Sequence, residues 1–270
     1  MRIAALGLLF FFQAAAPPLP PFLTNADRAG NRIEALAIVP DSAEEDRSAI
    51  ACERDGRCAL LRGDGENGQW RLHMFESRPG LDAVAARPLA VPDSADEEER
   101  LALWPHLVRE ANGAVLFGIL RTRSTGYSGG GASATRLTLV RLEPGSAALA
   151  LVLDAPIGGS AMIRACFGPS DERRRAGACH DEYELRADLT LDASNPAGRP
   201  RFLLTSRART YPGRLDRNED SATRPPFRRR DLVWATDPRC TYSRSFAFDA
   251  AAGRYLPDSA LPDCAQYLDL

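Results

Sequence analysis

The sequence predicts an all-β fold made of antiparallel strand meanders, with little helix. The first observation is that short segments in which apolar and polar residues alternate recur along the chain, as in half-buried strands. The second is that turn residues, such as Glu143-Pro144-Gly145 and Ala251-Ala252-Gly253, separate these segments at short intervals. Many short strands with regular turns are typical of β-propellers, β-sandwiches and barrels.

The clearest strand covers residues 183–192, in which charged or polar residues lie between the apolar ones. Because successive side chains of a strand point to opposite faces, the apolar residues share one face. The residues expected to point inward are Tyr183, Leu185, Ala187, Leu189 and Leu191. Residues 134–143 and 240–249 alternate in the same way, with Leu137, Leu139, Phe246 and Phe248 expected to point inward.

A weak internal repetition favours a propeller-like meander. Residues 137–153, 189–204 and 246–257 each consist of a strand, an acidic residue, a small loop with glycine and a second strand. Residues from about 101 to 156 could supply the four consecutive strands of one propeller blade. The repetition has no fixed period and no shared signature, so a β-sandwich or a barrel remains the alternative.

Two segments depart from the strand pattern. Ser94-Ala95-Asp96-Glu97 resembles a helix capping box and predicts one short helix over the residues that follow it. Residues 211–231 are polar, charged and contain proline, which indicates a long surface loop.

The N-terminus has the layout of a secretory signal peptide over residues 1–16, with an approximate cleavage site. Arg2 is followed by an apolar run over residues 3–12 and then by three alanines. The apolar run is about half of the roughly 20 residues that a membrane-spanning helix needs. We therefore expect a periplasmic or extracellular protein with no transmembrane segment in the mature chain, in which residues 17–270 form a single domain.

The six cysteines are an even number, which behind a signal peptide predicts disulfide bonds. Arg54-Asp55-Gly56 can form a three-residue hairpin loop that places Cys52 directly opposite Cys58. The other two predicted pairs close a polar loop and the C-terminal tail. These pairs are Cys166 with Cys179 and Cys240 with Cys264. Their spacing includes no Cys-x-x-Cys pair, so a zinc site is not predicted.

Composition excludes several functions. No lysine occurs in the sequence, so all 34 basic residues are arginine, and Schiff-base, phosphate-loop lysine and Ser-x-x-Lys chemistry are excluded. Only three histidines are present, which argues against a site built from imidazoles. The net charge of −2 provides no basic field for nucleic acid. We expect no cofactor and no nucleic-acid partner.

The stretch Gly126-Tyr127-Ser128-Gly129-Gly130 fits the G-x-S-x-G pattern of a hydrolase nucleophile elbow. An elbow requires a helix after the serine, whereas a strand-like pattern follows here. A serine hydrolase using Ser128 with His180 and Asp181 is therefore the alternative hypothesis. The favoured interpretation is a hairpin loop that presents Tyr127 and Ser128 at the surface, where they could bind a partner.

A second candidate for binding is the pair Arg207 and Arg209, which lie two residues apart and so share one strand face. That face could bind an anion or simply face the solvent. The three tryptophans, Trp70, Trp104 and Trp234, are expected to pack in the core or between strands.

No metal site is predicted. Residues 216–220 begin like a calcium-binding loop, but Ser221 and Phe227 stand where the loop requires glycine and glutamate. His180, Asp181 and Glu182 are adjacent in a predicted strand, so their side chains alternate between faces. The sequence thus favours a non-catalytic, exported β-domain that binds an unknown envelope protein, glycan or small ligand, or that contributes to envelope structure.

Overall fold

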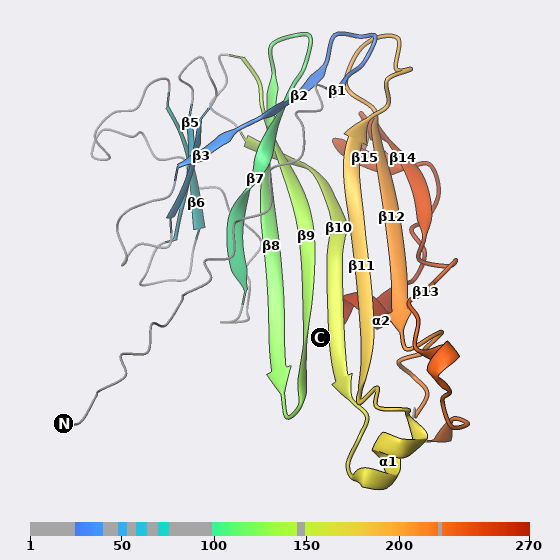
Figure 1. Cartoon of the computed structure of the whole chain (residues 1–270). Coiled ribbons are helices and arrows are strands. Elements are labelled where there is room, and N and C mark those ends of the chain that lie inside the picture. The colour runs from blue at the N-terminus through green and yellow to red at the C-terminus, as the bar shows by residue number, and fades with distance from the viewer. Residues whose placement is uncertain are drawn as a thin grey trace, which may run out of the picture.

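The computed structural model describes residues 25–39, 48–52, 58–63, 70–75, 99–144, 149–220 and 223–270. Its strands form two antiparallel sheets, and helical segments are few and short (Figure 1). The all-β prediction is therefore confirmed. The predicted signal peptide and the capping box at residues 94–97 lie outside the described residues.

The larger sheet is one continuous antiparallel meander. In spatial order its strands are β1 (Asn25–Ala26), β2 (Arg32–Ala35), β7 (Arg100–Arg109), β8 (Val115–Tyr127), β9 (Gly130–Leu142), β10 (Leu149–Arg164), β11 (His180–Leu191), β12 (Phe202–Tyr211), β14 (Tyr242–Asp249) and β15 (Arg254–Pro257), and the short β13 (Ala235–Thr236) also pairs with β12. A propeller divides its strands into separate blades. The strands of the larger sheet show no such division, so the propeller-like arrangement is not confirmed. The internal repetition corresponds to three successive hairpins of one sheet, β9–β10, β11–β12 and β14–β15.

The smaller sheet consists of β3 (Ala37–Val39), β4 (Ser48–Cys52), β5 (Cys58–Gly63) and β6 (Trp70–Phe75). Cys52 lies directly opposite Cys58 in the β4–β5 register, as the predicted hairpin requires. The side chains of both residues lie outside the described part of the structure.

The larger sheet curls so that its end strands return over its centre. β2 contacts β11, and β15 contacts β10. The main buried cluster lies between the parts of the sheet that are brought together in this way, and it includes Ile33, Leu116, Leu139, Leu204 and Tyr255. On β11, Tyr183, Leu185, Leu189 and Leu191 are buried on one face, and Ala187 of that face packs against the cluster, so the inward face predicted for residues 183–192 is confirmed.

A second buried cluster covers the opposite face of β7, β8 and β9. Its members include Leu103, Leu107, Phe117, Ile119 and Val140. The helix expected after residues 94–97 is wrong for residues 100–104, because these residues begin β7. Burial of Leu103, with Leu101 packed beside it, favours the strand over the local helical pattern.

Helix α1 (Pro169–Arg174) lies within the loop closed by the Cys166–Cys179 disulfide. The expectation of a loop without regular structure between these cysteines is wrong. Pro169 begins the helix, acidic residues occupy its first turn and arginines its last, all of which favour a helix. Among the described residues, no helix has the length and apolar character needed to span a bilayer.

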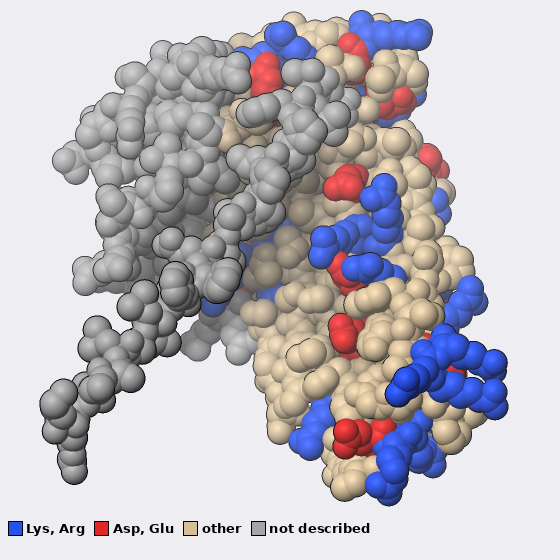
Figure 2. Space-filling view, viewed as in Figure 1, with Lys and Arg blue, Asp and Glu red and all other residues tan. Residues whose placement is uncertain are grey.

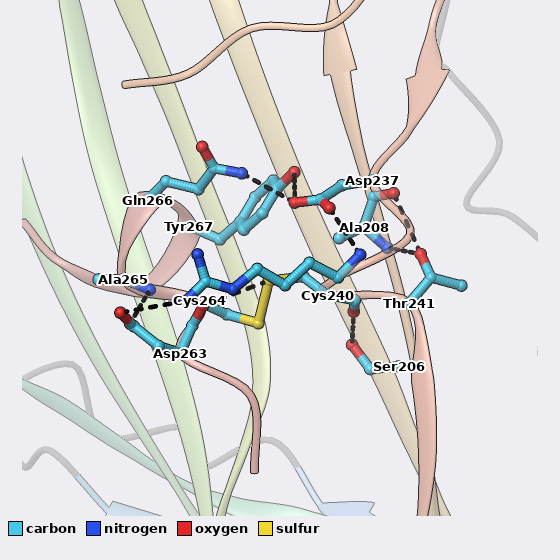
Figure 3. The surroundings of a disulfide bond; sticks show 11 residues. Ser206, Ala208, Asp237, Cys240, Thr241, Asp263, Cys264, Ala265, Gln266 and Tyr267 are labelled. Atoms are coloured by element: carbon cyan, nitrogen blue, oxygen red, sulfur yellow. Dashed lines mark hydrogen bonds and ion pairs between the residues drawn. A yellow bond between two sulfur atoms is a disulfide. The ribbon is translucent and has the colours of Figure 1, made fainter. Parts of the chain in front are cut away.

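The C-terminal helix α2 (Ala265–Leu268) contacts β9, β10 and β11 on the face that carries Tyr183, and the Cys240–Cys264 disulfide holds it there (Figure 3). Tyr267 is only 1% exposed and packs edge-on to Tyr183, with ring centroids 6.2 Å apart. Its hydroxyl donates a 2.9 Å hydrogen bond to Asp237 Oδ2 (Figure 3). Both expected loop-closing disulfides among the described residues are therefore present, and the second fixes the chain end.

Candidate binding face

The outward side chains of β10, β11 and β12 form the strongest candidate for a functional surface. In the direction of Figure 1, α2 lies behind these strands, so this view shows their outer face. Glu184 pairs across the strands with Arg209, and Arg186 pairs with Arg207. We define the binding face as Met162, Glu184, Arg186, Arg207, Arg209, Tyr211 and Trp234.

Arg209 is held in place by two different contacts. Its Nε donates a 2.6 Å hydrogen bond to Glu184 Oε2, and its guanidinium lies 4.3 Å from the centroid of the Trp234 ring. The first contact is a charge-assisted hydrogen bond and the second is a cation–π contact. Arg209 thus positions the indole ring beside a charged group.

Trp234 is 41% exposed, although it is a large apolar side chain. Its ring lies 5.6 Å from that of Tyr211, and its backbone forms a bridge with Gly213. Of the two expected placements, core or between strands, the core is wrong for Trp234, because it lies beside the two-residue strand β13 and none of the described strands covers its outer side. Trp104, in contrast, packs against the main core cluster.

Arg207 and Arg186 lie directly opposite each other with the same charge. Arg207 is exposed, and it forms no ion pair within the described part of the chain. Arg186 pairs with Glu184 at 2.5 Å, yet its side chain remains 82% exposed. Like charges in opposing positions of a sheet are unfavourable, so an anionic group placed between them would be stabilising. Asp188, at the next outward position of β11, offsets part of this charge, and Figure 2 shows the two signs interspersed on this face.

The neighbouring outer surface of β8, β9 and β10 is made of small residues. The hydroxyls of Ser133 and Ser160 lie 2.9 Å apart, and those of Thr122 and Thr135 lie 3.0 Å apart. Ser160 is directly opposite Glu184. Short side chains therefore adjoin the binding face on the side of β9.

Tyr127 and Ser128 are not part of the binding face, although their turn adjoins Met162, which pairs with Gly131 of β9. Tyr127 pairs with Gly130, so Ser128 and Gly129 form the turn between β8 and β9. Gly129 has φ +84, the left-handed conformation that favours glycine at the third position of such a turn. The hairpin interpretation of this stretch is confirmed. Tyr127 is 39% exposed, and its hydroxyl donates to the Gly131 carbonyl at 3.2 Å.

The three candidate catalytic residues are not brought together. His180 begins β11 and pairs with Arg164 of β10, whereas Ser128 follows β8 at the β9 side of β10. Two strand spacings separate β9 from β11, which is about 10 Å. Asp181 is buried on the opposite face from His180 and forms an ion pair with Arg175. This arrangement lacks the hydrogen-bonded chain of serine, histidine and carboxylate that acyl transfer requires.

No family model, curated protein or solved structure matches this chain. Function is therefore inferred from the geometry of the binding face.

The tyrosines whose pKa burial raises most lie in the core. Burial raises the pKa of Tyr183, Tyr255 and Tyr267 above the ordinary tyrosine value and lowers that of His106. Among the residues with described positions, no group of histidine, cysteine and carboxylate side chains is arranged to hold a metal ion. In the calcium-like segment, Asp216 Oδ1 accepts a hydrogen bond from the Asn218 backbone, as in an ordinary turn.

The sequence predicted Arg207 and Arg209 as candidate binding residues, but it did not predict the aromatic residues Tyr211 and Trp234 beside them. Tyr211 and Trp234 are separated by a long loop, and the pairing of β13 with β12 and the bridge of Gly213 with Trp234 bring them together. Local sequence offered no clear signal, because Leu232 and Val233 directly precede Trp234 and give it the setting of an apolar strand.

Proposed function

We propose that this chain is an exported, non-catalytic domain that binds a partner macromolecule through the binding face. The observation that carries the proposal is the exposed Trp234 ring held between Arg209 and Tyr211. Tryptophan, tyrosine and arginine are the residues most enriched at the energetic centres of protein interfaces. A fixed exposed ring also loses little conformational entropy on binding.

Export is supported by the layout of residues 1–16 and by the two disulfides. The mass of the purified mature protein tests it. We expect an N-terminus that begins after residue 16 or close to it, and six cysteines protected from alkylation until the protein is reduced. A retained N-terminus together with freely alkylated cysteines would contradict export.

Site-specific photocrosslinking in the producing cells tests the binding function. A photoreactive residue replaces Trp234 in one variant and Tyr211 in a second. The control carries the same residue at Ala251, an exposed position in the β14–β15 turn. We expect a discrete adduct from the first two variants and none from the control. Equal labelling at all three positions, or no adduct from either variant on the binding face, would contradict the proposal.

A further inference from the structure

A small cavity lies between α1 and the segment that precedes β13. Its volume is about 10 Å³, enough for one water-sized group. Its lining includes three arginines, Arg174, Arg175 and Arg224, together with the Phe227 ring and the Asp171 side chain. The cavity is separate from the binding face, and none of the residues of that face lines it.

The Arg175 guanidinium is buried, and one of its nitrogens has no hydrogen-bond partner among the described residues. The residue is 4% exposed, its Nε donates to the Ala178 carbonyl at 2.7 Å, and its Nη2 pairs with Asp181. Its Nη1 is buried and has no hydrogen-bond partner among the described residues. Buried donors are nearly always paired, so an unpaired guanidinium nitrogen in a residue that lines a cavity indicates an absent acceptor.

Two arginine runs that are far apart in the sequence meet at this cavity. The Phe227 backbone donates to the Arg174 carbonyl at 2.7 Å, and Arg174 Nη2 donates to the Arg224 carbonyl at 2.8 Å. The Phe227 ring lies 5.0 Å from the Arg175 guanidinium. Residues 173–175 and 228–230 therefore lie near each other. Figure 2 shows arginines gathered at this end of the sheet, near α1.

Acidic residues near the cavity offset part of its positive charge. Asp181 is already bound to Arg175, and Glu219 pairs with Arg224 at 2.7 Å. Asp171 Oδ2 accepts a hydrogen bond from the Phe167 backbone at 2.9 Å. Arg228 and Arg229 form no ion pair within the described part of the chain, so they add uncompensated positive charge close by.

We propose that this cavity is a binding site for a phosphate group. One phosphate oxygen enters the cavity and accepts a hydrogen bond from Arg175 Nη1. The remaining oxygens stay at the mouth, beside Arg174 and Arg224. The small volume fits a single oxygen, and arginine is the side chain best suited to bind phosphate oxygens.

Titration of the full mature protein with inorganic phosphate tests the site, with sodium chloride at equal ionic strength as the reference. We expect saturable binding by calorimetry and a rise in Tm that chloride does not produce. Arg224→Gln is expected to weaken phosphate binding about tenfold, because it removes one charged donor from the mouth. Arg239→Gln is the matched control, since Arg239 is an exposed arginine that pairs only with Asp263 at 3.5 Å. Arg175 is not replaced, because its loss would leave Asp181 buried without its partner.

A second arm distinguishes the source of the phosphate. Sedimentation with phosphatidylglycerol vesicles and with phosphatidylcholine vesicles tests a lipid headgroup. Binding of free phosphate, or of phosphatidylglycerol vesicles alone, supports the site if Arg224→Gln weakens it and Arg239→Gln does not. Equal effects of phosphate and chloride without vesicle binding, or binding that both variants retain equally, would overturn it. Because no residue of the binding face lines the cavity, failure of the phosphate test would not bear on the proposed function of that face.

Discussion

Substitution of Gly159 by alanine is expected to dislodge the C-terminal helix. Gly159 lies in β10, directly against α2. A Cβ atom there would lie 2.2 Å from the Tyr267 carbonyl oxygen and 3.0 Å from its carbonyl carbon. Gly158 provides the matched control, because its added Cβ would meet nothing closer than 3.7 Å.

The magnitude follows from the displacement that the clash requires. Ordinary contact begins at 3.4 Å, so the Tyr267 backbone has to move by about 1.2 Å, the difference between 3.4 and 2.2 Å. Backbone shifts forced by overpacking cost typically 1–3 kcal/mol, and we expect about 2 kcal/mol for Gly159→Ala. Gly158→Ala is expected to change the free energy of unfolding by less than about 1 kcal/mol.

Urea unfolding followed by circular dichroism measures both variants. With an m-value of about 2 kcal/mol/M, the expected loss lowers the midpoint of Gly159→Ala by roughly 1 M. The Cys240–Cys264 disulfide keeps the displaced tail attached, so the variant should still unfold cooperatively. Equal midpoints for the two variants would refute the placement of α2 against β10.

Three further predictions concern stability. Asp181→Asn is expected to cost about 3 kcal/mol in urea unfolding, because it leaves Arg175 buried without its ion pair, whereas Ser128→Ala should stay within about 0.5 kcal/mol. A small effect of Asp181→Asn would contradict a structural role for the pair. Burial raises the pKa of Tyr183, Tyr255 and Tyr267, so the unfolded chain loses these protons first, and the free energy of unfolding should fall as the pH rises above about 10. Denaturant titrations between pH 8 and 12 with constant stability would show this to be wrong. Replacing both cysteines of either loop-closing disulfide by alanine should cost about 3 kcal/mol, since the loops span 13 and 24 residues. Unchanged thermal stability of both double variants would count against these closures.

The strand content of this fold could be predicted because the alternation of residues is local. Residues 183–192 show which side chains point inward, and the structure buries them as expected. Turn residues likewise indicate the hairpin at Ser128 and Gly129. The arrangement of hairpins could not be predicted, because a single meander and a propeller blade have the same local pattern. Only contacts such as β15 with β10 distinguish them.

Only part of the candidate site could be predicted, because local alternation does not show which distant segments pair. Arg207 and Arg209 share a face by simple alternation. Trp234 joins them through the pairing of β13 with β12 and its bridge with Gly213, across a loop of some twenty residues whose path the sequence does not specify. The cavity at Arg175 depends on α1, a short helix that forms inside a disulfide-closed loop.

The most direct test of the binding face is hydrogen–deuterium exchange of the protein with and without its crosslinked partner. We expect slower exchange on binding in β11, β12 and residues 232–236, with no change in the β14–β15 turn. Protection confined to other strands, with β12 and residues 232–236 exchanging as in the free protein, would contradict the claim that this face binds the partner.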